Sequence, residues 1–354
     1  MSEGTINTTR IKVIGVGGGG NNAVNRMIAT GLDHVEYWSI DTTFKRPNTH
    51  PTKNILKIGN DTTNGLGAGS NPSIGRNAAN ESIEDINKLV LDTDMVFVTC
   101  GMGGGTGTGS APIVAKAAKE AGVLTIAIVT KPFRFEGAVR MRNAEEGIEE
   151  LKKVVDAFIV ISNDKLMDII EIKTSMKDAF KIADEVLYQS IYGISSLITK
   201  IGLINTDFAD IKTILKDMGS AFIGIGKASG ENRVIEAVDK ALASPLLEES
   251  FIGAEKILFN IAGSDKLTLA EITKASDIIV QTANPNAHII WGTIIDESLK
   301  DEIVVTIVSA GFKLIDKKIK STAFFDAKKS DDNNIEELFP FFAMNRKERE
   351  FANK

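Results

Sequence analysis

Short apolar runs alternate with longer amphipathic stretches along the first half of the chain. The apolar runs are Ile11–Val16, Val35–Ile40, Met95–Thr99, Val123–Val129 and Phe158–Ile161. Continuous hydrophobicity of this kind is typical of strands buried on both faces, as in a parallel sheet covered by helices. The pattern predicts a parallel-sheet, Rossmann-like α/β domain, which we assign to residues 11–175.

The second half begins with Met176–Lys200, a segment with few helix breakers that is longer than a typical globular helix. We expect a central connecting helix in residues 176–204, joining the first domain to a second, smaller α/β domain over residues 205–312. The strands predicted there are Ala221–Gly226, Lys256–Ile261, His288–Trp291 and Ile303–Val308. The helices predicted between them are Asn232–Leu242 and Thr268–Gln281.

Both ends of the chain differ from these domains. Residues 1–10 are polar and predict a flexible N-terminus. After Phe312 the composition turns to Lys, Asp, Asn and Ser, which predicts a linker over residues 313–334. Residues 335–354 carry an aromatic stretch that we interpret as a partner-binding peptide. The alternative is a disordered end with incidental aromatic residues.

Composition argues against several classes of protein. With 354 residues the chain is long enough for two domains, and its formal net charge of −6 disfavours a nucleic-acid partner held by phosphate contacts. Cys100 is the only cysteine, so no internal disulfide forms and a reducing compartment fits. The three histidines lack metal-ligand spacing, and no apolar run approaches the roughly 18 residues of a membrane-spanning helix.

The first glycine-rich loop, Gly15–Asn22, follows a predicted strand and opens a helix. Backbone N–H groups and the helix dipole favour a phosphate at such a position. The loop matches the G-x-G-x-x-G pattern, and Asp41 lies about 20 residues further on, as a dinucleotide-binding unit requires. Taken alone, this loop leaves a protein that binds NAD as an open alternative.

Two further glycine-rich loops change that interpretation. Gly101–Gly109 again joins a strand to a helix and adds two threonine hydroxyls, while Gly65–Asn71 opens onto another helix. Helix starts are predicted at Asn71–Pro72 and Ser110–Pro112, where a capping side chain precedes a proline. Three loops around one polyphosphate favour a nucleoside triphosphate, the alternative being simple tight turns. No G-x-x-x-x-G-K-[ST] sequence of a P-loop ATPase occurs.

Gly101–Gly109 contains the sequence GGGTGTG, which resembles the signature loop of the tubulin/FtsZ family. Four other stretches also resemble FtsZ, namely Gly15–Val24, Gly65–Arg76, Lys131–Gly137 with Arg140, and Asn205–Asp210. In order and spacing, the resemblance extends over about residues 11–312. It implies a GTP-binding protein that polymerises head to tail and hydrolyses GTP in an assembly-dependent way.

The resemblance also implies a set of residues that bind GTP or GDP. The phosphates would be surrounded by Gly18, Gly19, Gly20, Asn21, Asn22, Ala68, Gly69, Ser70, Asn71, Gly103, Gly104, Gly105, Thr106, Gly107 and Thr108. The ribose would be contacted by Glu136 and Arg140. Phe180 would stack on the guanine, whose polar edge Asn163 and Asp184 would recognise. The alternatives are a core aromatic residue at Phe180 and a solvated charge at Asp184.

Catalysis is expected from Asn205, Asp207 and Asp210. Asp207 and Asp210 are three residues apart and would be neighbours in the first turn of a helix, where capping alone could also explain them. In the resembled family this loop is inserted against the GTP of the next subunit, so the carboxylates would orient the attacking water while Mg²⁺ and the glycine loops hold the γ-phosphate.

The implied biology is that of a division-ring protein. We expect a homopolymer, adaptor proteins bound by the C-terminal peptide, only indirect membrane attachment, and a cytoplasmic location at mid-cell or, alternatively, an organelle stroma. Two other functions stay open: a non-hydrolysing GTP-binding paralogue that co-assembles, and a Rossmann oxidoreductase. The chain departs from the family pattern at Asp41-Thr42-Thr43, where Asn-Thr-Asp is usual, and in a tail that matches the family's terminal peptide only loosely.

Overall fold

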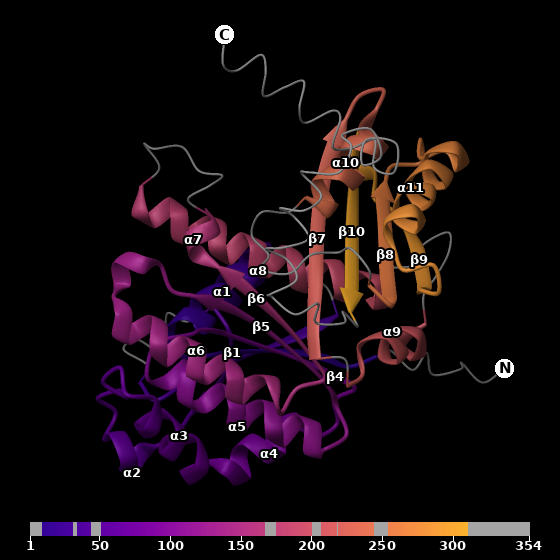
Figure 1. Ribbon diagram of the computed structural model, residues 1–354. Coiled ribbons are helices and arrows are strands. Elements are labelled where there is room, and N and C mark those ends of the chain that lie inside the picture. The colour runs from indigo at the N-terminus through magenta and orange to yellow at the C-terminus, as the bar shows by residue number, and fades with distance from the viewer. Residues whose placement is uncertain are drawn as a thin grey trace, which may run out of the picture. The chain divides into compact units, whose positions relative to one another are not determined.

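A single sheet with helices on both faces organises the fold. The computed structural model describes residues 9–30, 34–43, 51–166, 175–199, 207–217, 219–243 and 254–310, and every structural statement concerns these residues. Within them, ten strands follow one another across the sheet in the order β3-β2-β1-β4-β5-β6-β7-β10-β8-β9 (Figure 1). The first six strands of that order come from the first half of the chain.

Those six strands are parallel, so their carboxyl ends lie at one edge of the sheet. They are β1 Ile11–Val16, β2 Val35–Asp41, β3 Asn54–Lys57, β4 Met95–Gly101, β5 Leu124–Lys131 and β6 Ala157–Ser162. Successive residues of β4 alternate between two hydrophobic cores: Phe97 enters one core, and Val96 and Val98 enter the other. Burial on both faces explains the continuous apolar runs in the sequence.

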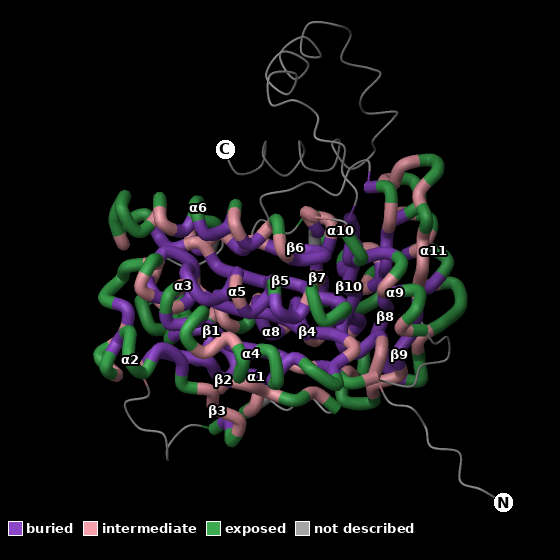
Figure 2. The backbone as a smooth tube through the Cα atoms, turned by 90° about the horizontal axis from the view of Figure 1, so that it is seen from below, coloured by how far each residue is buried: buried purple, intermediate pink, exposed green. Residues whose placement is uncertain are grey.

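One face of this half-sheet packs against α1 Gly17–Thr30, α8 Met176–Thr199 and α9 Phe208–Leu215. The other face packs against α3 Pro72–Glu81, α4 Ile83–Val90, α5 Thr106–Glu120 and α6 Ala138–Lys152. Figure 2 shows the buried strands between helices whose outer surfaces are exposed. Short helical turns complete this half, namely α2 Asn60–Thr63, η2 Arg134–Glu136 and α7 Asn163–Leu166.

The second half contributes β7 Gly219–Ser229, β8 Lys256–Gly263, β9 His288–Ile295 and β10 Glu302–Ala310. β7 pairs with β6 at only two positions, at the start of β7, and this pairing joins the two parts of the sheet. β10 is antiparallel to β7 and β8, while β8 and β9 are parallel. The helices of this half are α10 Arg233–Leu242, α11 Leu269–Thr282 and the turn η3 Glu297–Leu299.

The helix α8 has 24 residues and is about 35 Å long at the usual rise per residue. Its buried side chains, among them Leu187, Ile191 and Ile194, belong to the same core as Ile223 of β7 and Leu258 of β8. A continuous core therefore connects the parallel sheet, α8 and the second half. The predicted fold class, a parallel α/β domain joined by a long helix to a second α/β domain, is confirmed.

Two local predictions differ from the structure. β3 was not predicted, because it is a short strand at the sheet edge with half-exposed side chains. The predicted cap at Ser110 is wrong: α5 begins at Thr106, and Pro112 lies inside the helix. Ser110 is buried and its hydroxyl donates to the carbonyl of Gly75, 2.8 Å away. The cap at Asn71 is confirmed, since its side chain accepts from the N–H of Ser73.

Candidate functional site

The three glycine-rich loops meet at the carboxyl ends of the parallel strands. A side-chain carbon at Gly17, which has a φ of 70°, would lie 2.7 Å from the backbone nitrogen of Gly107. One at Gly105 would lie 2.9 Å from the backbone nitrogen of Asn71. Backbone therefore contacts backbone between the loops, which only glycine permits at these two positions. The helices α1, α3 and α5 begin at this junction.

One glycine from each loop faces open space. A side-chain carbon at Gly18, Gly69 or Gly104 would have no neighbour within 4 Å. These positions leave room for a ligand to approach the backbone at three helix N-termini, where N–H groups without intrahelical partners favour an anion. The predicted phosphate loops are thus brought together by the fold, with their least obstructed positions on the side where a polyphosphate could bind.

Several other predicted phosphate residues shape the loops from inside. A side chain at Gly20 would clash with the carbonyl of Thr99, so this glycine allows α1 to pack against β4. The Thr108 hydroxyl accepts a hydrogen bond of 2.8 Å from the N–H of Gly103 and is buried. The side chain of Asn21 is also buried, and it donates to Asp41 rather than facing the pocket.

A chain of polar contacts connects the end of β2 to the start of α5. Asn21 Nδ2 lies 3.2 Å from Asp41 Oδ2, and the N–H of Thr42 donates to Asp41 Oδ1 at 2.8 Å. The hydroxyl oxygens of Thr42 and Thr106 are 2.8 Å apart. Burial raises the pKa of Asp41, although the hydrogen bonds from Thr42 and Asn21 oppose that shift. Thr42, the residue of this stretch that matches the family's Asn-Thr-Asp, therefore supports Thr106, one of the predicted phosphate-binding residues, and the departure at Asp41 lies directly behind it.

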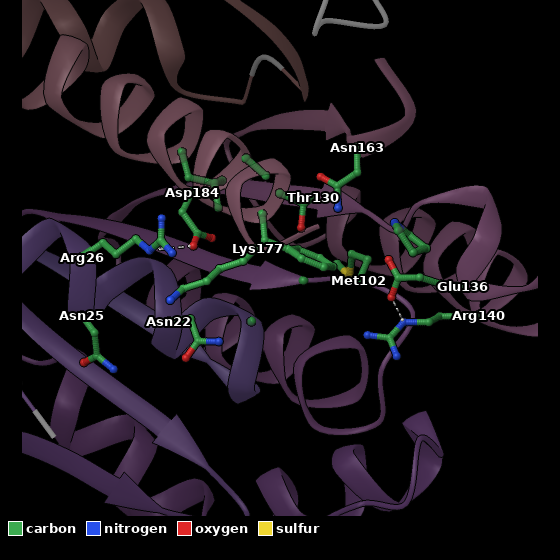
Figure 3. A pocket seen from close by; sticks show the side chains of 16 residues that line it. Asn22, Asn25, Arg26, Met102, Thr130, Glu136, Arg140, Asn163, Lys177 and Asp184 are labelled. Atoms are coloured by element: carbon green, nitrogen blue, oxygen red, sulfur yellow. Dashed lines mark ion pairs between the residues drawn. The ribbon is translucent and has the colours of Figure 1, made fainter. Parts of the chain in front are cut away.

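A cavity of about 670 Å³ lies next to the glycine loops (Figure 3). This volume is in the usual range for a bound small molecule. Of the predicted nucleotide residues, those that line it are Gly19, Asn22, Glu136, Arg140, Asn163, Phe180 and Asp184. In Figure 3 the side chains from α1 line one side and those of Glu136 and Arg140 line the other. Residues separated by more than 150 positions in the sequence thus meet in one cavity.

Asp184 and Arg26 form an ion pair inside the cavity, with Arg26 Nε 3.1 Å from Asp184 Oδ2. The Asp184 side chain is only 16% exposed. Burial raises the pKa of Asp184 to about 6, against the smaller opposing effect of the Arg26 charge. A carboxylate held in this way can accept hydrogen bonds from a ligand, and its ionisation is poised near neutral pH.

Asn163 supplies a second acceptor in the cavity wall. The residue is buried, and among the described residues its Oδ1 has no hydrogen-bond partner. A buried polar atom without a partner is costly unless a ligand or water satisfies it. Asn163 and Asp184 together fit the polar edge of guanine, whose N1–H and exocyclic amine are donors.

Phe180 presents an aromatic ring to the cavity. It is 37% exposed, so it is not a core residue, and its ring packs edge-on against Phe133 with centroids 5.3 Å apart. A nucleobase could stack on the exposed part of this ring. Glu136 and Arg140 are paired across one helical turn, with Arg140 Nε 2.9 Å from Glu136 Oε2.

Sequence reasoning missed part of the cavity wall, including Asn25, Arg26 and Lys177. Asn25 and Arg26 lie one turn after Asn22 on α1, and Lys177 lies one turn before Phe180 on α8. Helical spacing from predicted residues could therefore have found them. For Lys177, the described residues supply no ion-pair partner, so the wall carries an available positive charge.

The predicted catalytic carboxylates lie elsewhere. Asp207 occupies the N-cap position of α9 but makes no capping hydrogen bond with its side chain. Both Asp207 and Asp210 are exposed, and neither carboxylate has a partner in the described part of the chain. Capping, the alternative explanation for Asp207, is therefore not its role here. Asn205 lies outside the described residues, and so does the C-terminal peptide.

Features of other kinds of chemistry are absent from the part of the chain that the structure describes. The described residues contain no group of three or more His, Cys, Asp or Glu side chains arranged to hold a metal ion. No helix among them combines the length and apolar character needed to cross a bilayer. Cys100 is fully buried, and burial raises the pKa of its thiol to about 12.

Comparison with known proteins supports the resemblance over most of the chain. A family model described as the Tubulin/FtsZ family GTPase domain matches residues 10–171. A model described as the FtsZ family C-terminal domain matches residues 219–313. The two matches cover both halves of the sheet.

Solved structures give the same result. FtsZ from M. jannaschii, in an empty dimer, is 46% identical with a TM-score of 0.82, over 87% of this chain and 89% of that chain. A mutant of the same protein is also 46% identical, with a TM-score of 0.81 over 86% and 91% of the two chains. CetZ2 from Haloferax volcanii, in a GTPγS-bound protofilament, is 19% identical with a TM-score of 0.75 over 90% and 100%, which supports the fold alone.

Proposed function

Because the chain belongs to the FtsZ family of polymerising GTPases, we propose that it hydrolyses GTP at the interface between successive subunits of a head-to-tail filament. The nucleotide would bind in the cavity beside the glycine loops of one subunit. Asp207 and Asp210 of the next subunit would complete the site. Because of this family match, we no longer consider the alternative of a dinucleotide-binding oxidoreductase, which the first loop alone left open.

The observation that carries this proposal is the separation of the two halves of the site within one chain. The cavity lies at the carboxyl ends of the parallel strands, where α5 begins with Thr106. The end of α9 is tied to the opposite end of α5, because Lys119 Nζ lies 2.8 Å from Asp217 Oδ1. A helix of 15 residues is about 20 Å long. The helix α9 also packs against β8, in the second half of the sheet (Figure 1), so we do not expect Asp207 and Asp210 to reach the phosphate loops of their own subunit.

The exposure of the two carboxylates agrees with a role at an interface. Within the described residues neither carboxylate has a partner, so both are available to a neighbouring molecule. Contact between two different faces of identical subunits does not close, so it generates an open filament. Hydrolysis would then depend on assembly, because an isolated subunit carries its GTP and its carboxylates on different faces, where they cannot meet.

Within the completed site, the chain's own groups have distinct tasks. The N–H groups at the three helix N-termini would hold the phosphates, and Asp207 and Asp210 would orient and polarise the attacking water. Mg²⁺, when bound, neutralises phosphate charge; it usually keeps waters and takes ligands from the phosphates, so it needs no cluster of protein carboxylates. The Thr106 hydroxyl would donate to a phosphate oxygen, supported by its 2.8 Å contact with the Thr42 hydroxyl.

Selectivity for GTP would come from Asp184 and Asn163. Adenine has no donor at N1 and no amine at C2, so ATP would leave the buried acceptors without partners. The same wall would bind GDP, because it contacts the base and not the γ-phosphate. Phe180 would add stacking that does not distinguish between bases.

The wider role follows from the family. We propose that the filaments form a division ring at mid-cell in a cytoplasm, or in an organelle stroma, and that the C-terminal peptide binds adaptor proteins that attach the ring to the membrane. These proposals predict that deletion from Ile335 onward leaves GTP hydrolysis intact and abolishes adaptor binding. Loss of hydrolysis on truncation would contradict them.

Phosphate release from GTP, measured against protein concentration together with sedimentation, tests the proposed function. Activity per subunit should rise above a threshold concentration at which protein begins to pellet. Asp210→Ala should still pellet with GTP and should lose about 100-fold in turnover, equivalent to about 3 kcal/mol. Turnover per subunit that is independent of concentration, or an Asp210→Ala variant as active as wild type, would contradict the shared site, and a wild type that pellets with GTP without releasing phosphate would leave the non-hydrolysing paralogue as the better description.

A further inference from the structure

Lys119, near the C-terminal end of α5, is surrounded by acceptors from two other segments. Its Nζ lies 2.8 Å from Asp217 Oδ1, 3.0 Å from the carbonyl of Val155 and 3.4 Å from Asp156 Oδ1. An ammonium group has three donors, and here three acceptors are within reach. Lys119 thus joins α5 to the residues before β6 and to the turn after α9.

Asp156 is the buried centre of this arrangement. Its side chain is 6% exposed and accepts from the N–H of Thr125 in β5 at 2.8 Å. It also accepts from the N–H of Asp217 at 3.4 Å, while its carbonyl accepts from the N–H of Gly219 at 2.9 Å. A buried carboxylate needs a cation and hydrogen bonds, and Lys119 supplies the cation. We call Lys119, Asp156 and Asp217 the α9 anchor.

The α9 anchor holds the C-terminal end of a helix whose other end carries the predicted catalytic carboxylates. Asp217 is seven residues beyond Asp210, which corresponds to about 10 Å along a helix axis. The second half of α9 is fixed, since Ile214 and Leu215 are buried in the main core and Lys256 Nζ donates to the carbonyl of Thr213 at 2.8 Å. In the first turn the side chains of Asp207 and Asp210 are exposed, while Phe208 and Ile211 on the other side of the helix pack against the core.

We propose that Lys119 is a positioning residue for GTP hydrolysis, which fixes the direction of α9 and so the place of Asp207 and Asp210 in the next subunit's nucleotide site. This inference rests on the proposed function. Lys119 acts through α9 and touches no nucleotide in its own subunit, because it lies at the end of α5 remote from Thr106.

The distance from the α9 anchor to the carboxylates sets how strongly a tilt of α9 would affect GTP turnover. If the helix tilts by about 10° around its C-terminal end, carboxylates about 10 Å away move by nearly 2 Å. A misplacement of about 1 Å can reduce the rate of an enzyme by 100-fold. The ion pair with Asp217 is half exposed and screened by solvent, so the buried contact with Asp156 provides most of the constraint.

The test compares Lys119→Met with Lys119→Arg in the full-length chain. Lys119→Met keeps the aliphatic stem and removes the cation, so the turnover per pelleted subunit should fall by about tenfold or more. The affinity for GTP, measured at a concentration below assembly, should stay within twofold of wild type. Lys119→Arg retains the charge and should retain most of the turnover. Lys116→Met is the matched control: it lies on the same helix, in an exposed pair with Glu120, and should change nothing.

A second variant keeps the test valid if Lys119→Met folds poorly. Asp217→Asn removes the negative charge next to Lys119 but keeps one acceptor oxygen, and it leaves the contact between Lys119 and Asp156, so it should lower turnover about two- to threefold without changing GTP affinity. The inference is overturned if both variants turn over GTP like wild type, or if turnover falls only in step with GTP affinity. Measuring Asp210→Ala in the same assay distinguishes failure of the proposed function from failure of the role of Lys119. If Asp210→Ala is also fully active, the proposed function fails. If Asp210→Ala is inactive while the Lys119 and Asp217 variants are active, only the role of Lys119 fails.

Discussion

Replacement of Asp184 by asparagine should weaken GTP binding and change the preferred nucleotide. Asp184 lies in the cavity wall beside Arg26 and has the acceptors that guanine's N1–H and exocyclic amine require. Asparagine has nearly the same shape but offers one acceptor and one NH₂ donor. One of the two contacts to guanine would be lost, and two donors would face each other.

The magnitude follows from the burial of the site. A hydrogen bond to a charged, buried group contributes about 1.5–3 kcal/mol, and a donor facing a donor adds a further penalty. A loss of about 3 kcal/mol corresponds to a dissociation constant about 100-fold higher. Xanthosine triphosphate has a carbonyl where guanosine triphosphate has the amine, so it accepts from the new NH₂ group. Asp184→Asn should therefore bind xanthosine triphosphate more tightly than GTP.

Titration calorimetry with protein below its assembly concentration measures these affinities directly. Inosine triphosphate, which lacks the exocyclic amine, serves as a second probe: it should bind wild type more weakly than GTP does, and the variant should distinguish the two nucleotides less. Asp178→Asn is the control, since Asp178 lies on the same helix, outside the cavity, in a pair with Lys181. It should bind GTP like wild type.

Because the pKa of Asp184 is raised, the affinity for GTP should also depend on pH. Burial raises this pKa to about 6, so the carboxylate is ionised above that pH and protonated below it. Only the ionised form accepts from both guanine donors, and the dissociation constant of wild type for GTP should rise about tenfold per pH unit below about 6. The affinity of Asp184→Asn should not follow this slope. Equal GTP binding by the two proteins at pH 7.5, or the same slope in both, would refute the role assigned to Asp184.

Two further predictions concern stability. Because burial raises the pKa of Asp41, its charged form destabilises the fold as the pH rises above the carboxyl's ordinary range. Asp41→Asn should raise the melting temperature by about 2 °C at pH 7 and by nothing at pH 4, and a lower melting temperature at pH 7 would contradict this. Arg233 lowers the pKa of Glu271 to about 2 through hydrogen bonds of 2.7 and 3.2 Å, so this stabilisation is complete above about pH 4.5 and is lost as the pH falls toward 2. Arg233→Met should lower the free energy of unfolding by about 3 kcal/mol at pH 7, measured by urea titration. The difference in unfolding free energy between wild type and variant should become smaller below pH 4.5. If that difference stays constant with pH, the ion pair is not its cause.

The sequence predicts the buried parts of this fold better than its edges. Strands such as β4 are apolar throughout because they are covered on both faces, and this leaves a pattern that needs no tertiary information. β3 has only four residues at the sheet edge, so its pairing with β2 depends on contacts that no local pattern records. The start of α5 was predicted too late because Ser110 and Pro112 have the pattern of a helix start. In the structure the Ser110 hydroxyl instead donates a hydrogen bond to the carbonyl of Gly75.

In the nucleotide site, too, local features could be predicted from the sequence and long-range contacts could not. The glycine loops could be predicted from local sequence, since close backbone contact at Gly17 and Gly105 requires glycine. The direction of a side chain could not: Asn21 follows Gly20 in the first loop, yet it turns into the protein and holds Asp41. Arg26 was not predicted because its role depends on the ion pair with Asp184, which is distant in the sequence and adjacent only in the fold.

If each nucleotide site is completed by the neighbouring subunit, a mixture of two variants should recover activity that neither variant has alone. Asp210→Ala subunits keep a normal guanine pocket but have an impaired α9, whereas Asp184→Asn subunits keep a normal α9 and accept xanthosine triphosphate in place of GTP. With both nucleotides present, every pocket can be filled, and release of labelled phosphate from GTP reports only the Asp210→Ala pockets. Neither variant alone should hydrolyse GTP at a substantial rate.

If sites are shared between subunits, an equal mixture should hydrolyse GTP at about a quarter of the wild-type rate. Half of the subunits bind GTP, and half of those meet an intact α9 from a neighbour, provided that the two variants assemble at random. If Asp210 instead acted within its own subunit, the mixture would be no more active on GTP than the two variants measured separately. That result would contradict the account.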